Sequence, residues 1–287
     1  MLTNATSTVL ATGLAFPEGP AFAPDGSLWA VELQGESLVQ WANGTLTRHR
    51  VGGAPNGIAI DGRGRVWFCD AGLNAIRRFD PQTGQCDMLI DAVAGKPLDK
   101  PNDLAFDAVG NLVFTCPGNS RQQPTGYVCV LTPAGEVRRI ADGLYFPNGL
   151  AFAPGGTELV IAETYRHRLW RGHWNPARGV WRGARVWASV EGPAGPGGPD
   201  GMAFDQAGNL YVAVYGTGSL SVISPDGIVT QRVALPGRNP TNCAFDLSGE
   251  PGLIVTEAER GVILRVAVAG RGLPLFTRIQ TLKPILS

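Results

Sequence analysis

The sequence is poor in the residue types on which many structural and catalytic sites depend. It has three histidines and five cysteines in 287 residues, with no Cys-x-x-Cys pair. An odd cysteine count without such pairs argues against both a disulfide framework and a zinc cage. Cys69, Cys116 and Cys243 lie inside apolar stretches, which indicates buried free thiols.

Charge and long apolar stretches are also scarce. The 24 basic and 24 acidic residues cancel, so no global field attracts nucleic acid or an anionic membrane. No run of 18 apolar residues occurs, and the first residues lack a basic segment followed by an apolar one. We therefore expect a cytoplasmic, soluble protein with a small-molecule partner, no nucleic-acid or membrane contact, and a monomeric or weakly homo-oligomeric state.

Glycine and proline, by contrast, are abundant. The 39 glycines and 22 prolines exceed a fifth of the chain, and 44% of the residues are hydrophobic. This composition is typical of many short strands joined by tight turns around a sizeable core.

A proline, a polar residue and usually a glycine recur six times, each time before a short apolar strand, a turn and a second strand. The prolines of this motif lie 38, 46, 46, 52 and 41 residues apart. That spacing is typical of four-stranded propeller blades. The six copies are Pro17-Glu18-Gly19, Pro55-Asn56-Gly57, Pro101-Asn102-Asp103, Pro147-Asn148-Gly149, Pro199-Asp200-Gly201 and Pro240-Thr241-Asn242.

The repeat predicts an all-β fold, a six-bladed β-propeller of four-stranded antiparallel blades that forms a single domain over residues 1–287. The segment 8–14 resembles 136–144, which should be the outermost strand of a blade. We therefore expect the N-terminal strand to complete the last blade and close the ring.

A propeller brings equivalent positions of all blades to one axis, so the six motifs should meet at one face. In each blade the second strand runs back to the face where the motif lies. We therefore also expect the residues at the end of that strand to line the mouth of the ring at this face. These residues are Glu32, Asp70, Cys116, Glu163, Tyr215 and Glu257. The turns near residues 25, 155 and 226 should lie at the opposite face or the periphery.

The motif ring favours a metal site. Glutamate has no special turn propensity, so the carboxylate of Glu18 in a slot otherwise filled by Asn, Asp or Thr suggests a ligand. Asp200 adds a second carboxylate, and crowded carboxylates repel unless a cation binds. Oxygen donors suit calcium, magnesium or manganese better than zinc. A polar plug of hydrogen-bonded turns is the alternative, and Asn56 fits either role.

Phe16-Pro17-Glu18-Gly19, Pro101-Asn102-Asp103, Phe146-Pro147-Asn148-Gly149 and Gly198-Pro199-Asp200-Gly201, in this order, resemble the senescence marker protein 30/gluconolactonase family (SMP-30/gluconolactonase/LRE-like region). The resemblance covers nearly the whole chain. It implies a bacterial-type sugar lactonase, a carboxylic ester hydrolase. Glu18, Asn148 and Asp200 would hold one divalent metal, with calcium as the first candidate and Mg²⁺, Mn²⁺ or Zn²⁺ as alternatives.

The resemblance also implies that Asn102 touches the substrate or a water, and that Asp200 is the catalytic base for opening a gluconolactone-like sugar lactone to its hydroxy acid. Lys100 stands where several members have arginine, and Asp103 is either a supporting residue or a surface one. Arg121, Tyr127 and Tyr215 are candidates for substrate contact from loops over the mouth.

Two other readings stay open. The segment 146–170 also resembles strictosidine synthase-like propellers, in which Glu163 or a neighbour would act without a metal. The third possibility is a non-catalytic propeller that binds a ligand on this face. His49, His167 and His173 lie outside the motif slots, which disfavours a histidine-activated nucleophile.

Overall fold

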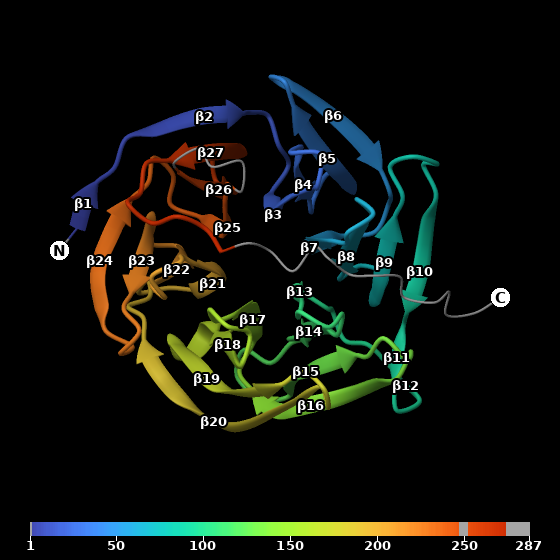
Figure 1. Ribbon diagram of the computed structural model, residues 1–287. Coiled ribbons are helices and arrows are strands. Elements are labelled where there is room, and N and C mark those ends of the chain that lie inside the picture. Colours follow the sequence, from blue (N-terminus) through green and yellow to red (C-terminus); the bar gives the residue numbers. More distant parts are fainter. Residues whose placement is uncertain (1, 247–251, 274–287) are drawn as a thin grey trace.

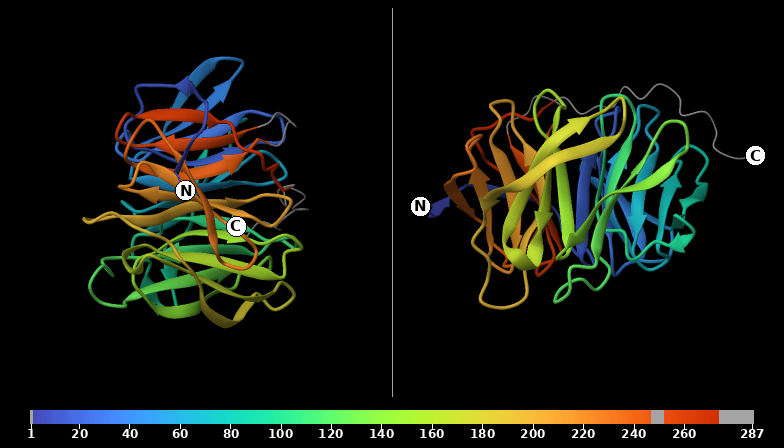
Figure 2. Two further views of the ribbon diagram at one scale, coloured as in Figure 1. Left: turned by 90° about the vertical axis from the view of Figure 1, so that its left-hand side faces the viewer. Right: turned by 90° about the horizontal axis from the view of Figure 1, so that it is seen from below.

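The computed structural model describes residues 2–246 and 252–273, and within them it shows a ring of six antiparallel sheets around a central axis (Figure 1). The strands run roughly along that axis, as the side views show (Figure 2). This arrangement confirms the predicted six-bladed propeller. Met1 and residues 247–251 and 274–287 of the predicted domain lie outside the described residues.

Each blade is a meander that starts at the axis and ends at the rim. Blade 1 consists of β3 (Pro17–Phe22), β4 (Leu28–Glu32), β5 (Ser37–Ala42) and β6 (Thr45–Arg50). Blade 2 consists of β7 (Pro55–Ile60), β8 (Val66–Asp70), β9 (Ala75–Phe79) and β10 (Cys86–Ile90), followed by the small hairpin of β11 (Ala92–Val93) and β12 (Lys96–Pro97). Blade 3 consists of β13 (Leu104–Phe106), β14 (Leu112–Cys116), β15 (Gly126–Leu131) and β16 (Val137–Leu144).

The second half of the ring repeats the pattern. Blade 4 consists of β17 (Pro147–Phe152), β18 (Glu158–Glu163), the 3₁₀ turn η1 (Thr164–Arg166), β19 (Arg168–Asn175) and β20 (Val180–Ser189). Blade 5 consists of β21 (Gly198–Phe204), β22 (Leu210–Tyr215), β23 (Ser219–Ile223) and β24 (Val229–Ala234). Blade 6 contains β25 (Pro240–Phe245), β26 (Leu253–Glu257) and β27 (Val262–Val266).

The N-terminal segment closes the ring, as the sequence predicts. Strand β2 (Ser7–Ala11) pairs antiparallel with β27 and becomes the outermost strand of blade 6. Strand β1 (Leu2–Asn4) pairs parallel with β24, which gives blade 5 a fifth strand that the repeat did not predict. Residues 2–11 therefore hold blades 5 and 6 together (Figure 1).

The core lies between neighbouring blades and follows from an Ala-Phe pair in the inner strands. Side chains of a strand alternate between its two faces, so the alanine faces one neighbouring blade and the phenylalanine the other. Phe152 of blade 4 packs in one cluster with Ala105 of blade 3, and Phe204 of blade 5 packs with Ala151 of blade 4. The small alanine leaves room for the ring from the next blade. The same contact joins Phe106 to Ala59 and Phe245 to Ala203, and Ile60 takes the place of the phenylalanine in blade 2.

All five cysteines are free, and Cys69, Cys116, Cys129 and Cys243 are buried. This confirms the predicted buried thiols. Within the described part of the chain, no helix is both long and apolar enough to cross a membrane.

Candidate functional site

The six motifs meet at one face of the ring, called here the motif face, where the inner strands begin. In most blades the inner strand has a bulge at the motif: the register of β3 against β4 shifts between Glu18 and Ala21, and that of β17 against β18 shifts between Pro147 and Leu150. A bulge turns side chains out of the regular alternation. This local irregularity directs the polar residue of each motif toward the axis.

The residue before the motif proline is strained in three blades. Phe16, Lys100 and Phe146 have φ angles of 59°, 50° and 60°, in the left-handed region. This conformation costs about 1–2 kcal/mol for a residue with a side chain, and a following proline restricts it further. Such outliers concentrate at functional sites, where the surrounding structure holds them in place.

Motif glycines allow neighbouring blades to approach closely. A methyl group on Gly57 would lie 2.2 Å from Oδ1 of Asp103, and one on Gly149 would lie 2.2 Å from the carbonyl oxygen of Asp200. A side chain at either position would push the polar residue of the next blade away. The glycine of one motif therefore makes space for the carboxylate-bearing residue of the next.

Threonine hydroxyls fix the motifs to one another. The hydroxyl of Thr115 donates to the carbonyl of Asn148 at 2.8 Å, and that of Thr164 donates to the carbonyl of Pro199 at 2.8 Å. Thr241 donates to the carbonyl of Pro17 at 2.8 Å and so joins blade 6 to blade 1. Thr241, which the repeat placed among the ring side chains, therefore serves the backbone of its neighbour.

Three carboxylates lie buried within electrostatic reach of each other at this face. Burial, together with the charge of Asp103, raises the pKa of Glu18 to about 8. Burial raises the pKa of Asp103 to about 7. Burial and the charges of Glu18 and Asp103 raise the pKa of Asp200 well above its usual range. Without a cation, this cluster of acids is costly to ionise.

Amide side chains surround the carboxylates. The Asn148 side chain donates to the Thr164 hydroxyl at 3.2 Å and also hydrogen-bonds Asp200. The Asn242 side chain hydrogen-bonds both Glu18 and Asp103, while its Oδ1 accepts the Cys243 N–H at 2.8 Å. Asn242 is a site residue that the sequence reasoning missed, because the repeat aligned its neighbour Thr241 with the polar slot.

Asn56 presents a buried oxygen with no partner. Its Oδ1 is buried and has no hydrogen-bond partner among the described residues. Leaving a buried acceptor unpaired costs about 1–3 kcal/mol, and such atoms are rare unless a ligand or water binds them. This atom favours a ligand-binding role for Asn56 over a turn role.

The donor set fits a divalent cation. Glu18, Asn148 and Asp200 are 5%, 5% and 8% exposed and offer carboxylate and amide oxygens, the ligands of hard cations. No three His, Cys, Asp or Glu side chains in residues 2–246 and 252–273 converge closely enough to hold a metal by themselves. A metal here would therefore need the amide oxygen of Asn148 as well as the carboxylates.

The remaining predicted substrate residues are placed differently from one another. Asn102 is half-buried beside Asp103, and its backbone N–H donates to the carbonyl of Thr115 at 2.9 Å. Lys100 is exposed, and its Nζ donates to Oδ1 of Asn119 at 2.8 Å. Arg121 lies with its guanidinium carbon 5.7 Å from the centre of the Phe146 ring and 5.3 Å from that of Tyr165.

Tyr127 does not join these residues. It lies in β15, is 3% exposed, and its hydroxyl accepts the N–H of Asp99 at 3.0 Å. Arg139 covers its ring at 3.7 Å. The sequence analysis placed Tyr127 in a loop over the mouth, but this residue pairs with Cys116 inside the blade.

Of the predicted ring of strand-end residues, Tyr215 faces the site. Its ring stacks on Phe16 at 6.3 Å, and its pKa is raised by burial and by the charge of Asp200. The prediction was wrong for four carboxylates of that ring, which are buried and accept backbone N–H groups from the loop that enters their blade. These are Glu32 from Ala15, Asp70 from Ala54, Glu163 from Tyr145 and Glu257 from Asn239.

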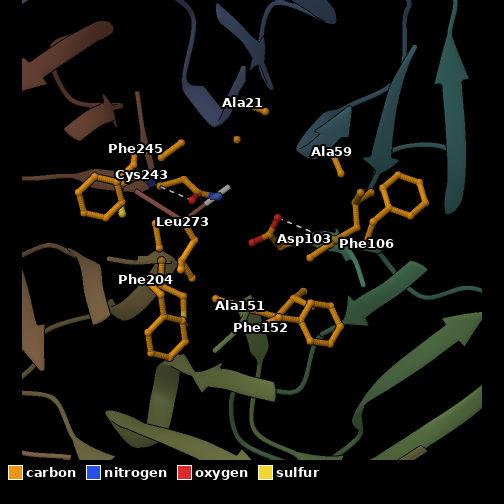
Figure 3. A pocket seen from close by; sticks show the side chains of 18 of the residues that line it. Ala21, Ala59, Asp103, Phe106, Ala151, Phe152, Phe204, Cys243, Phe245 and Leu273 are labelled. Carbon is orange, nitrogen blue, oxygen red and sulfur yellow. Dashed lines mark hydrogen bonds between the residues drawn. The ribbon is translucent and has the colours of Figure 1, made fainter. Parts of the chain in front are cut away.

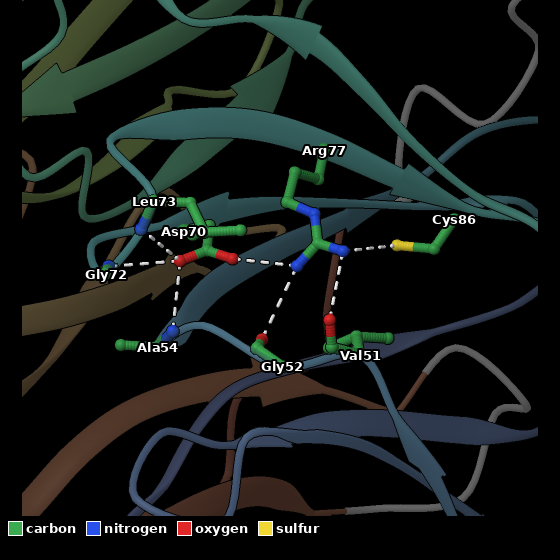
Figure 4. A network of polar contacts seen from close by, with 8 residues as sticks. All are labelled: Val51, Gly52, Ala54, Asp70, Gly72, Leu73, Arg77 and Cys86. Carbon is green, nitrogen blue, oxygen red and sulfur yellow. Dashed lines mark hydrogen bonds and ion pairs between the residues drawn. The ribbon is translucent and has the colours of Figure 1, made fainter.

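Asp70 shows how such a carboxylate is satisfied (Figure 4). Its Oδ1 accepts N–H groups of Ala54, Gly72 and Leu73, and its Oδ2 pairs with Arg77 at 2.8 Å. Arg77 in turn donates to the carbonyl of Val51 and contacts the sulfur of Cys86. These carboxylates brace the loops between blades.

The fold and the site together define a six-bladed propeller with buried carboxylates and amides at one end of its axis. The chain belongs to the SMP-30/gluconolactonase/LRE-like region family, whose model matches residues 16–259. This finding confirms the family resemblance of the motifs.

Relatives of known name cover most of the chain. A gluconolactonase of Zymomonas mobilis is 30% identical over 232 residues, which span 75% of this chain and 64% of that protein. A diisopropyl-fluorophosphatase of Loligo vulgaris is 28% identical over 275 residues, spanning 86% of this chain and 87% of that protein. The solved structure of a gluconolactonase of Xanthomonas campestris superimposes with a TM-score of 0.79 at 29% identity, covering 92% of this chain and 89% of that one.

Proposed function

We propose that this protein is a metal-dependent lactonase that opens a sugar lactone to its hydroxy acid. The observation that supports it most directly is the set of Glu18, Asn148 and Asp200, three buried oxygen-bearing side chains on the motifs of blades 1, 4 and 5. The relatives named gluconolactonase supply the reaction class. The finer assignments, gluconolactone-like substrate and calcium as the ion, are part of this proposal.

The proposed chemistry follows from the site. A divalent cation held by Glu18, Asn148 and Asp200 would act as a Lewis acid toward the lactone carbonyl. Asp200, as a carboxylate, takes a proton from the attacking water, whose oxygen adds to the carbonyl carbon. The bond from that carbon to the ring oxygen then breaks, and the ring oxygen takes the proton from Asp200 and becomes a hydroxyl group. No covalent enzyme intermediate is needed.

Other residues orient the lactone. Asn56 offers its unpartnered Oδ1 to a substrate hydroxyl or a water, and Asn102 lies half-buried beside Asp103. Phe16 and Tyr215 stack on each other, and Tyr215 lies within electrostatic reach of Asp200. Lys100 and Arg121 are exposed at this face and would contact the outer part of the substrate.

The test is hydrolysis of glucono-, xylono- and arabinonolactones, followed by proton release, with chelated protein before and after addition of Ca²⁺, Mg²⁺, Mn²⁺ or Zn²⁺. Metal should restore turnover, and Asp200→Asn should lower kcat by about 10²–10⁴-fold. Glu18→Gln should weaken metal binding in calorimetry. Asp226→Asn, in an exposed turn at the opposite face, is the control.

The outcomes separate the three readings. Turnover that survives chelation would favour a strictosidine synthase-like, metal-independent enzyme. Metal binding without hydrolysis of any lactone would favour a ligand-binding propeller.

A second candidate activity is hydrolysis of organophosphorus esters, which the relative named diisopropyl-fluorophosphatase supports. The same cation would polarise a phosphoryl oxygen. Turnover of a paraoxon-like ester no faster than in chelated protein would exclude this activity.

A further inference from the structure

A cavity of about 780 Å³ runs along the ring axis on the side of the carboxylates away from the motif face (Figure 3). It extends from Asp103 and Asn242 to the turn at Pro154 and Gly155, between the first two strands of blade 4. Cavities of about 300–1,000 Å³ are typical of small-molecule sites. The proposed metal ligands Glu18, Asn148 and Asp200 are not among the residues that line this volume.

The cavity exists because the inner strands carry alanine at six equivalent positions. These alanines are Ala21, Ala59, Ala105, Ala151, Ala203 and Ala244. The larger side chains next to them, such as Phe152 and Phe204, are buried between blades. Among the described residues the axis is therefore hollow, with the alanines around it and the labelled phenyl rings directed away from it (Figure 3).

Among the described residues, two polar side chains line this hollow, both at its inner end. Asp103 reaches into it, and the carboxylate Oδ1 accepts the N–H of Leu104 at 2.9 Å (Figure 3). Asn242 hydrogen-bonds the same carboxylate. Glu18 and Asp200 lie beyond them, so the inner end of the apolar cavity is acidic.

The charges leave one carboxylate uncompensated, and this step rests on the proposed metal site. Glu18, Asp103 and Asp200 carry three negative charges when ionised, and one divalent cation neutralises two of them. Of the three, Asp103 is the carboxylate that lines the cavity. A buried carboxylate is costly to ionise without a cationic partner, and a cation in the cavity would supply one.

We propose that the axial cavity binds an organic ammonium ion with an apolar body, whose ammonium group donates hydrogen bonds to Asp103 and whose hydrocarbon part lies among the alanines. An anion would be repelled by the acidic end, and a neutral amphiphile would leave the charge unpaired. An inorganic cation such as Ca²⁺ prefers six to eight oxygen ligands. Among the described side chains that line the cavity, Asp103 and Asn242 carry such oxygen atoms, too few for this ion.

The test uses n-octylammonium, 1-octanol and octanoate as probes of equal chain length, titrated by calorimetry into calcium-loaded protein. Calcium binding is measured first and separately, so that failure of the metal site is distinguished from failure of the cavity. Octylammonium should bind at one site per chain and at least about tenfold more tightly than octanol, and octanoate should bind least. A charged hydrogen bond supplies a preference of this size.

Two variants separate charge from volume. Asp103→Asn should reduce the preference for octylammonium over octanol to less than about threefold, with Asp226→Asn as the matched control. Ala59→Leu should weaken both ligands together by about tenfold, because it fills part of the cavity without changing its charge. Circular dichroism and the Tm establish that each variant is folded.

Three outcomes would overturn the proposal. These are equal affinity for the three probes in wild-type protein, a preference for octylammonium that persists in Asp103→Asn, and displacement of octylammonium by further Ca²⁺ at constant ionic strength. Binding of octylammonium by a protein that hydrolyses no lactone would support the cavity site while removing the proposed function.

Discussion

The hydroxyl of Thr115 in blade 3 donates a 2.8 Å hydrogen bond to the backbone carbonyl of Asn148 in blade 4. It therefore holds a proposed metal ligand from outside that ligand's own blade. Thr115→Val keeps the shape and leaves this buried carbonyl unpaired, which costs about 1–3 kcal/mol. We expect weaker metal binding in calorimetry and a Tm lower by several degrees. Thr47→Val, on an exposed strand of blade 1, is the control. Equal metal affinity in Thr115→Val and wild type would contradict this positioning role.

The raised pKa values predict an unusual dependence of stability on pH in chelated protein. The pKa of Glu18 has its ordinary value of 4.5 in the unfolded chain and is raised to about 8 in the folded one. The folded state therefore binds the proton more tightly. The resulting gain in the free energy of unfolding is complete below pH 4.5 and is lost as the pH rises to about 8. Asp103 and Asp200 act in the same direction. The Tm of chelated protein should fall over this range.

Bound metal should reverse the trend. A cation replaces the protons on these carboxylates, so its affinity should rise with pH and its binding should release protons. Calorimetry at pH 7 in buffers of different ionisation enthalpy measures this release. A Tm independent of pH in chelated protein, with no proton release on metal binding, would show that the carboxylates are not a coupled site.

The unpartnered Oδ1 of Asn56 predicts a trade between stability and activity. Asn56→Leu replaces the buried polar oxygen by an apolar group of similar size, which should leave the Tm unchanged or raise it by about 1–3 °C. Turnover of the sugar lactone should fall, with the larger effect on KM if this oxygen binds a substrate hydroxyl. A lower Tm with unchanged kinetics would instead assign Asn56 to the turn.

Glu163 should matter for stability and not for chemistry. Its carboxylate is fully buried and accepts hydrogen bonds from Tyr145, Arg168 and Trp170. Glu163→Gln should destabilise the fold by about 1–3 kcal/mol, with metal-dependent turnover of the folded protein retained. Glu36→Gln, in an exposed pair with Arg50, is the control. Loss of turnover at an unchanged Tm would favour the reading in which Glu163 is part of the active site.

The architecture could be predicted from the sequence because the same local pattern occurs six times. A copy with a less clear pattern can therefore be interpreted from the others. Ring closure by segment 8–14 was predictable for the same reason, since that segment resembles the outer strand of another blade. The parallel pairing of β1 was not, because three residues of an edge strand carry no repeat signal.

The site was predictable in its motif residues and less so in its surroundings. Glu18, Asn148 and Asp200 share one slot of the repeat, but Asn242 lies one residue beyond it. The bulge of β25 ends at this residue, and sequence spacing does not reveal where a bulge falls. The roles of Glu32 and Glu257 were missed for a related reason. Strand direction placed them at the correct face, but whether a carboxylate points to the axis or into a loop depends on partners that the repeat does not encode.

The pairing of β2 with β27 sets the order in which the protein can be completed during synthesis. Ser7–Ala11 leaves the ribosome first among the strands of blade 6, and its partner Val262–Val266 is made roughly 250 residues later, which at about 5–20 residues per second leaves β2 unpaired for tens of seconds. Thr8 and Arg265, paired in the finished ring, place polar side chains at this late junction. Strand β2 is thus made early and is among the last strands to find its partner, and until the ring closes its unpaired edge in the unfinished chain can pair with other chains.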